Sequence, residues 1–244
     1  MSGHSKWHNI QQRKGKQDAA RSNVFSKYAK QIMIVARTGG GNPEMNFSLR
    51  LLIDKAKAAA MPKDNIERAI KRGTGEITDG AQVEESIYEA YGPGGVAVII
   101  KTLSDNKNRT VSDLKHILSQ HGGSMGGAGS VMWMFQQMGV IRMPNIKFPI
   151  SNLDWESFEL VLIENGAEDI SEEDGEIEIK TKMENYKKIL DKLKELGLEP
   201  TESGLQYVAK DKIKVDDHVG AKLEELFGDL EAHDDVDDYW TNAE

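Results

Sequence analysis

The chain has 244 residues, no cysteine and a formal net charge of −9 at pH 7. The absence of cysteine excludes disulfides, thiolate nucleophiles and cysteine-ligated zinc or iron–sulfur sites. The longest strongly apolar runs, 32–36 and 96–100, are far shorter than the ~20 residues that span a bilayer. The first residues are polar and basic, without the apolar segment of a secretory leader. We therefore expect a cytoplasmic globular protein without membrane partners.

The charge is divided unevenly along the chain. Residues 1–75 contain 15 Lys and Arg against 5 Asp and Glu, whereas residues 76–244 contain 16 against 35. Basic side chains attract the phosphates of nucleic acids. The division predicts a head that faces nucleic acid and an acidic body, although compositional drift would give the same numbers.

The first third of the chain predicts an arm and three helices. Residues 1–18 have little hydrophobic periodicity, so we expect an arm there. Apolar residues then recur at spacings of three and four. Three glycines end the first helix, an Asn-Pro-Glu signal begins the second, and a capping-box-like spacing begins the third. The predicted helices are 19–37, 43–61 and 64–72.

After residue 76 the period changes to that of strands. Residues 83–91, 96–103 and 130–135 are predicted strands, and a helix capped by Thr110 lies between the last two. Residues 139–204 follow the order β-α-β-β-α-β, which is typical of a ferredoxin-like arrangement. Its last strand is predicted near 198–200. A strand at 205–209, a helix at 219–231 and a strand at 236–241 are expected to complete the earlier sheet.

These elements predict an α+β fold in which one α/β domain is inserted into another. The expected domains are a basic arm and three-helix domain (1–76), a discontinuous α/β domain (77–135 with 205–244) and an inserted ferredoxin-like domain (136–204).

The arm is the first candidate site. Lys and Arg can neutralise phosphates, while Trp and His can stack on unpaired bases. Trp7 has no helical apolar face around it, so it has no obvious role in a core. The alternative is an arm that folds back and packs Trp7 on the helices. The candidate residues of the arm are His4, Lys6, Trp7, His8, Arg13, Lys14 and Lys16.

Basic residues of the helices form a second candidate, with a solvated surface as the alternative. A third is the turn at 105–110, where a helix N-terminus beside an arginine can hold an anion; a simple capping turn explains it slightly better. These candidates add Arg21, Lys27, Arg68, Arg72 and Arg109 to the predicted nucleic-acid site.

Features of an enzyme are weak in this sequence. Five of the eight residues at 122–129 are glycine, but no Gly-Lys-Ser/Thr follows them, so a structural loop is favoured over a phosphate loop. The six histidines lack zinc-binding spacing, and no G-x-S-x-G elbow is present. The acidic run Asp234–Asp238 is more typical of a solvated face than of a metal site. We expect no cofactor, no metal and no catalytic residue.

Six segments of the chain together carry a resemblance to one family: 3–7, 13–32, 61–75, 91–101, 106–110 and 122–135. In these segments the chain resembles the YebC/PmpR family, which includes bacterial proteins classed as transcriptional regulators and a mitochondrial translational activator. The resemblance implies a helical N-terminal domain, two α/β domains and a non-enzymatic cytosolic factor that binds DNA or ribosomal RNA.

Three functions follow as hypotheses. One is a DNA-binding transcriptional regulator, the second a ribosome-associated factor that binds ribosomal RNA, and the third a metal-dependent nucleic-acid-processing enzyme. An arm with Trp and His suits unpaired bases, and no recognition helix for a major groove stands out, which slightly favours RNA. The expected partners are a nucleic acid and the ribosome, and the expected state is a monomer.

Overall fold

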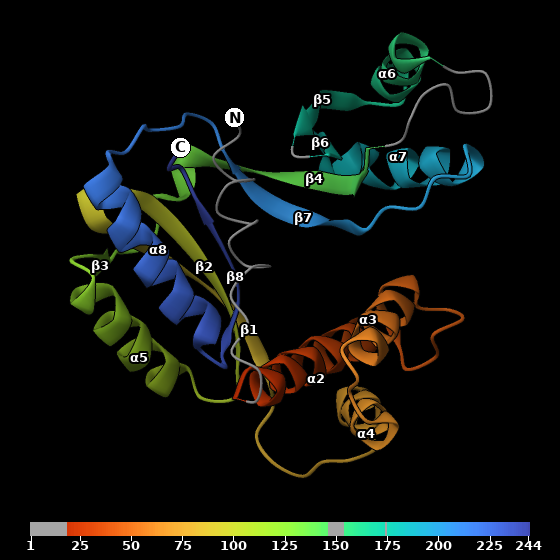
Figure 1. Ribbon diagram of the computed structural model, residues 1–244. Coiled ribbons are helices and arrows are strands. Elements are labelled where there is room, and N and C mark those ends of the chain that lie inside the picture. Colours follow the sequence, from red (N-terminus) through yellow and green to blue (C-terminus); the bar gives the residue numbers. More distant parts are fainter. Residues whose placement is uncertain (1–18, 146–153, 174) are drawn as a thin grey trace. The chain divides into compact units, whose positions relative to one another are not determined.

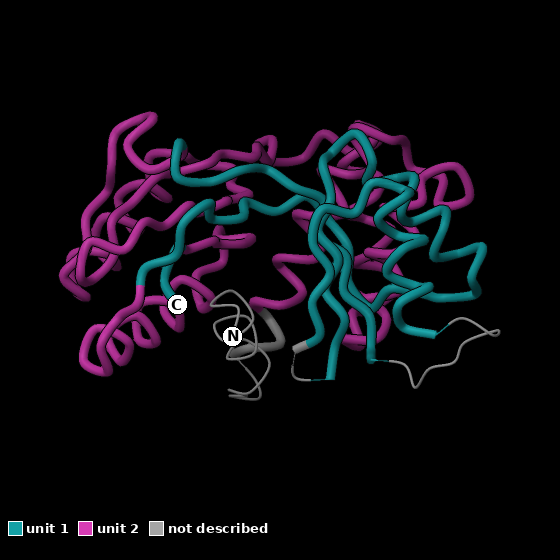
Figure 2. Tube along the Cα trace, turned by 90° about the horizontal axis from the view of Figure 1, so that it is seen from above, with its two compact units in different colours: residues 1–6, 133–213, 242–244 teal, residues 7–132, 214–241 magenta. Residues whose placement is uncertain are grey.

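The computed structural model describes residues 19–145, 154–173 and 175–244. Its described residues fold into two compact units, shown in different colours in Figure 2. The larger unit contains residues 19–132 and 214–241, and the smaller unit contains 133–213 and 242–244. Each unit has one four-stranded sheet. The predicted α+β fold with an inserted ferredoxin-like unit is confirmed.

Three helices form the head of the larger unit: α2 (Ala19–Gly39), α3 (Phe47–Ala58) and α4 (Lys63–Thr74). Ile32, Leu49 and Ile66 belong to their shared apolar core. Where α4 crosses α2, Gly73 lies so close that a Cβ there would be 2.5 Å from the carbonyl oxygen of Met33. The predicted bundle is therefore present, and glycine permits its tightest crossing.

The second helix begins later than the sequence predicted. The Oδ1 of Asn42 accepts a hydrogen bond from the backbone N–H of Glu44, which makes this segment a turn. Asn46 is the actual N-cap, because its side chain accepts a hydrogen bond from the N–H of Leu49. Its amide also donates to the carbonyls of Val35 and Gly40. Asn46 thus joins α2 to α3, a role that the Asn-Pro-Glu signal concealed.

The sheet of the larger unit has the order β3-β1-β2-β8. Its strands are β1 (Glu84–Tyr91), β2 (Ala97–Ser104), β3 (Ser124–Met125) and β8 (Val236–Thr241). Helices α5 (Lys107–Gln120) and α8 (Asp217–Ala232) lie along one face (Figure 1). Seven of the eight residues of β2 are buried, as its apolar sequence predicted. The predicted return of 236–241 to this sheet is confirmed by its pairing with β2.

The smaller unit has the order β5-β6-β4-β7, with every pair antiparallel. Its elements are β4 (Phe135–Pro144), α6 (Trp155–Glu164), β5 (Ala167–Glu173), β6 (Glu176–Lys182), α7 (Met183–Glu195) and β7 (Glu202–Ala209). Ile141, Ile179, Phe158 and Leu193 belong to the core between the sheet and the two helices. From the neighbouring position on β4, Arg142 binds Glu178 and Glu202 at 2.7 and 3.0 Å.

Three strand predictions were wrong. Residues 198–200 form no strand, and the closing strand of the ferredoxin-like sheet is β7. Residues 205–209 are therefore in this sheet and not in the sheet of β1. Residues 132–134 form a short 3₁₀ turn before β4, so 130–135 is no strand. Alternating apolar residues predict that a segment is a strand, but they do not choose its neighbour.

Helix α5 is capped by Asn106 and not by Thr110. The Oδ1 of Asn106 accepts from the N–H of Arg109, three residues later. Thr110 lies one turn inside the helix and is fully buried.

Candidate nucleic-acid interface

The predicted interface divides into a part that the structure describes and a part that it does not. His4, Lys6, Trp7, His8, Arg13, Lys14 and Lys16 lie outside the described residues, as does the side chain of Arg21. Lys27, Arg68, Arg72 and Arg109 are described. Their surroundings differ sharply, and these differences define which of them can meet a ligand.

One side of α2 is bound to residues 231–237 of the same unit. We call this contact the seam. Lys27 donates from its Nζ to the carbonyl oxygen of Glu231 at 2.7 Å. Lys30 forms a 2.6 Å ion pair with Asp235 and also donates to the carbonyl oxygen of Asp234. Gln31 donates to Asp237 at 2.7 Å. The basic residues of this side therefore hold the head on the sheet.

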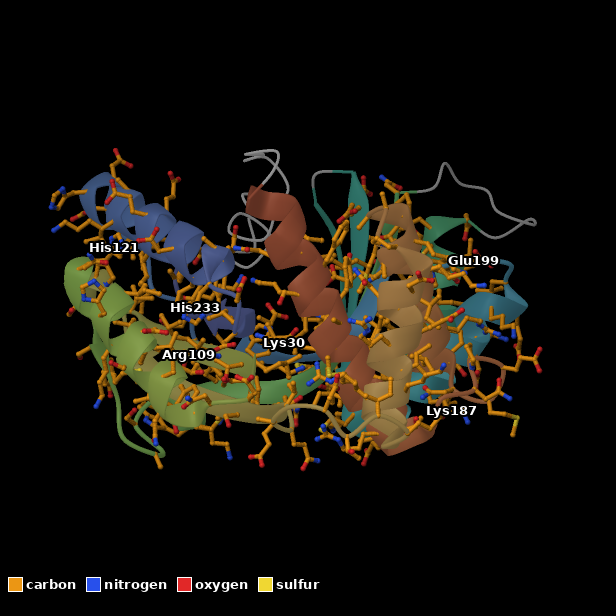
Figure 3. The ribbon with its side chains drawn as sticks, turned by 90° about the horizontal axis from the view of Figure 1, so that it is seen from below. Lys30, Arg109, His121, Lys187, Glu199 and His233 are labelled. Carbon is orange, nitrogen blue, oxygen red and sulfur yellow. The ribbon has the colours of Figure 1, made fainter. Side chains whose placement is uncertain are left out.

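Asp235 is the centre of the seam. It is only 2% exposed, and it forms ion pairs with Lys30 from α2 and Arg109 from α5. Both basic residues are labelled in Figure 3. Thr110 and Ser104 lie 2.8 and 3.1 Å from its Oδ2. Burial alone would raise the pKa of Asp235, but the hydrogen bonds from Lys30, Arg109 and Thr110 hold the pKa well below its ordinary value. Asp235 is thus a buried carboxylate that stays ionised.

The remainder of the acidic run 234–238 has structural contacts as well. Asp237 forms a 2.9 Å ion pair with Lys101 of β2, in addition to its bond with Gln31. The Oδ1 of Asp238 accepts from the N–H of Tyr239. Within the described ranges, no three His, Asp or Glu side chains are grouped so that they could hold a metal ion.

The guanidinium of Arg109 is already bound to two carboxylates. It lies beside the N-terminus of α5, as predicted, but its Nη2 is 3.0 Å from Asp105 and 2.9 Å from Asp235. These partners raise the pKa of Arg109, the hydrogen bond with Asp235 most of all. A phosphate would have to compete with two carboxylates for this guanidinium, so the geometry favours a capping turn over an anion site.

The glycine-rich segment 122–129 also has an internal explanation. Glu89 of β1 accepts backbone hydrogen bonds from Gly129, Val131 and Met132 at 2.6–2.7 Å. Partial burial raises the pKa of Glu89, but these three donors together hold it below its ordinary value. The N–H groups that could cradle a phosphate already hold a carboxylate. The preference for a structural loop agrees with this geometry.

The other side of α2 faces α4 across an open groove. The groove has a volume of about 250 Å³. Arg68, at its rim, is exposed. Arg72 is half-buried and bonded to Asp79, by an ion pair of 3.2 Å and a bond to its carbonyl oxygen of 2.8 Å. The groove is lined by Phe25, Ser26, Ala29, Met33, Met61, Asn65, Arg68, Ala69 and Arg72.

Two aromatic residues of the head were not among the predicted site residues. Phe25 lines the groove, and Phe47 begins α3 with 53% of its surface exposed. The guanidinium of Arg50 lies 5.1 Å from the centre of the Phe47 ring. The signal for Phe47 was an aromatic residue outside the apolar stripe of its helix. Phe25 gave no such signal, because it falls on the stripe of α2.

A helical head with an open basic groove, joined to a sheet and followed by an inserted ferredoxin-like unit, defines a class of multidomain α+β proteins. None of the helices in the described ranges combines the length and apolarity needed to cross a membrane.

Comparisons with known proteins place the chain more closely. Residues 5–76 match the family described as TACO1/YebC protein N-terminal domain, and residues 83–243 match the TACO1/YebC second and third domain. The chain belongs to the TACO1/YebC family.

Similar proteins cover almost the whole chain. A probable transcriptional regulatory protein of Pseudothermotoga lettingae is 45% identical over 100% of this chain and 94% of its own length. One of Thermotoga petrophila is 46% identical with the same coverage. A crystal structure of a conserved hypothetical protein from Aquifex aeolicus, 38% identical, matches with a TM-score of 0.79 over 93% of this chain and 91% of that one.

Proposed function

We propose that this protein is a non-enzymatic regulator of gene expression that binds nucleic acid through its helical head, and that the nucleic acid is ribosomal RNA. The names of its relatives support a regulator. The charge of residues 1–75, together with the exposed arginine at the α2–α4 groove, supports a nucleic-acid partner. The absence of cysteine and the acidic body fit a cytoplasmic factor that meets basic ribosomal proteins.

The observation that carries this proposal is the unequal use of basic residues in the head. Lys27 and Lys30 serve the seam, whereas Arg68 and Lys71 of α4 are exposed. Among the described residues, neither Arg68 nor Lys71 forms an ion pair, so phosphates could approach these two side chains without breaking one. The arm residues predicted from the sequence would extend this surface, with Trp7 and His8 available to stack on bases.

RNA is favoured over a DNA duplex because of the charges on α4. Its exposed residues Asp64 and Glu67 alternate with Lys63 and Arg68. In a major groove these acids would lie close to phosphates, and direct reading of bases needs donors and acceptors along one unopposed face. A head that combines scattered charge with aromatic residues suits unpaired RNA instead. DNA-binding transcriptional regulation remains the second candidate, since the relatives carry that name.

A competition experiment tests the proposal. Purified full-length protein would be titrated with a folded ribosomal RNA fragment and with promoter and random DNA duplexes of equal length, at one salt concentration near the physiological value. We expect the RNA to bind more tightly and the duplexes to differ little. A promoter duplex that outcompetes the RNA and exceeds random duplex by about 10³-fold, as specific regulators do, would establish the DNA function instead.

Enzymatic processing of the nucleic acid is tested in the same samples. Labelled RNA and DNA should stay intact with added magnesium or manganese. Cleavage that disappears in Asp237→Asn or Asp238→Asn, with folding retained, would support the metal-dependent enzyme.

A further inference from the structure

The groove between α2 and α4 combines the open edge of the head's apolar core with polar side chains of α4. Phe25, Ala29 and Met33 come from successive turns of α2, and Asn65, Arg68 and Arg72 come from one face of α4. Positions 25 and 27 of α2 are rotated by about 200° at 100° per residue. The groove therefore lies on the side of α2 opposite to Lys27, whereas Lys30, four residues after Ser26, lies between the two sides.

The floor of the groove is apolar. Met33, Met61 and Ala69 are nearly buried, with 9%, 5% and 2% of their surfaces exposed, and Phe25 is half-buried beside them. Thioether and aromatic side chains are polarisable, and they make favourable contacts with flat rings.

The rim of the groove is polar and positive. Asn65 can donate and accept hydrogen bonds, and both it and Arg68 are exposed. No carboxylate of the described residues forms an ion pair with Arg68, whereas Asp79 holds the guanidinium of Arg72 in place. One arginine of the rim is thus fixed, and the other can turn toward a ligand.

An apolar floor with this rim suits a ligand that is flat, able to form hydrogen bonds and negatively charged at one end. A free phosphate would make no favourable contact with Phe25 and the methionines. An apolar helix of a partner protein would leave the guanidinium of Arg68 and the amide of Asn65 without partners, at a cost. A nucleotide with an unstacked base satisfies both parts.

We propose that this groove binds one unstacked nucleotide of single-stranded RNA, with the base against Phe25, Met33 and Met61 and with Arg68 on the adjoining phosphate. The proposal rests on the RNA-binding function above and names the site and chemical class of its ligand. Asn65 is positioned to recognise the edge of the base.

The test compares two fluorescent probes of equal length and charge: an oligouridine of about 8 nucleotides, within single-strand site sizes, and its abasic counterpart. Stacking on one aromatic side chain is worth roughly 5- to 150-fold in affinity. Phe25→Leu keeps the apolar contact but loses the ring face. We expect it to weaken oligouridine binding by about fivefold or more and to leave the abasic probe unchanged. Arg68→Gln should weaken both probes.

Matched controls come from the same head. Phe47→Leu and Arg50→Gln make the same changes outside the groove and should preserve the difference between the probes. Since Phe25 also packs against the core, a second variant is needed in case Phe25→Leu unfolds. Ser26→Leu adds bulk at the groove without an aromatic face and removes no core atom, and it should abolish the preference for the base-bearing probe.

The outcomes separate the two proposals. If the protein binds oligouridine but Phe25→Leu and Ser26→Leu change both probes equally or not at all, the groove is not the nucleotide site and RNA binding stands. If the wild-type protein binds neither probe and no folded ribosomal RNA, both proposals fail.

Discussion

Basic residues on the two sides of α2 have opposite surroundings: the lysines of α2 itself on one side, and Arg68 of the facing helix α4 on the other. On the seam side, the ammonium groups of Lys27 and Lys30 contact a carbonyl oxygen and a carboxylate of residues 231–235. On the groove side, Arg68 is exposed beside an apolar floor. Local sequence alone does not separate the two sets. The comparison teaches that a basic side chain is available to a ligand only where no acceptor of the protein itself already binds it.

The seam should depend most strongly on Asp235. Replacing Asp235 with Ala leaves Lys30 and Arg109 without their shared carboxylate. Breaking a buried charge pair costs about 3–5 kcal/mol, and we expect a loss of this size in the free energy of unfolding measured with urea. The matched control is Asp234→Ala, an exposed neighbour that contributes its carbonyl to Lys30; it should change stability by no more than about 0.5 kcal/mol. Equal losses for both variants would disprove the central role of Asp235.

Acid should weaken the seam through the same residue. Because the folded-state pKa of Asp235 is depressed, the unfolded chain binds the proton first as the pH falls. The contribution of Asp235 is complete above its unfolded pKa of about 3.9 and is lost as the pH falls from there through the folded pKa. Urea denaturation at a series of acidic pH values should show a flatter pH dependence for Asp235→Asn. An unchanged slope would mean that other carboxylates dominate acid unfolding.

The groove side should be sensitive to the spacing between its helices. Gly73→Ala places a Cβ 2.5 Å from the carbonyl oxygen of Met33, and overpacking of this kind costs about 1–3 kcal/mol. The control is Gly220→Ala in α8, where the added Cβ meets nothing within 4 Å. It should raise stability by about 0.4–1 kcal/mol. Thermal melting of both variants measures the difference, and a neutral Gly73→Ala would show that α4 can move away from α2 easily.

The smallest expected effect concerns the salt dependence of RNA binding. The double variant Arg68→Gln with Lys71→Gln should flatten the log–log slope by about 0.7 for each phosphate that these side chains neutralise in the wild-type complex. Lys27→Met removes the same kind of charge on the seam side and should leave the slope unchanged, because its ammonium binds Glu231. Titration at several salt concentrations measures both slopes. A larger change for Lys27→Met would reverse the assignment of the two sides.

The sequence predicted local secondary structure better than it predicted contacts between residues that are far apart in the chain. Helix α2, strand β2 and the ferredoxin-like order follow from periodicities of a few residues, and the structure confirms them. The partner of Lys30 could not be predicted in this way, because Asp235 lies 205 positions away. Residues 205–209 were assigned to the wrong sheet for the same reason. Their alternating apolar residues predict a strand, but they fit either sheet equally well.

The candidate site was predictable only in part. Arg68 and Arg72 were named as basic residues of the predicted helices, and both line the groove. Phe25 was assigned to an apolar stripe, and a stripe does not show where two helices separate enough to leave an opening. Lys27 was named for its charge and Arg109 for its place beside a helix N-terminus, and the internal contacts of both are visible only in three dimensions.

The insertion of the smaller unit between β3 and α8 has a consequence for synthesis on the ribosome. All four strands of the smaller unit are available once residue 209 has emerged. Strand β2, in contrast, waits for β8, and Lys30 waits for Asp235 near the end of the chain. Contacts so distant in sequence form slowly. The inserted unit can therefore fold first during translation, while the ion pair of Lys30 with Asp235 forms only after the last residues leave the ribosome.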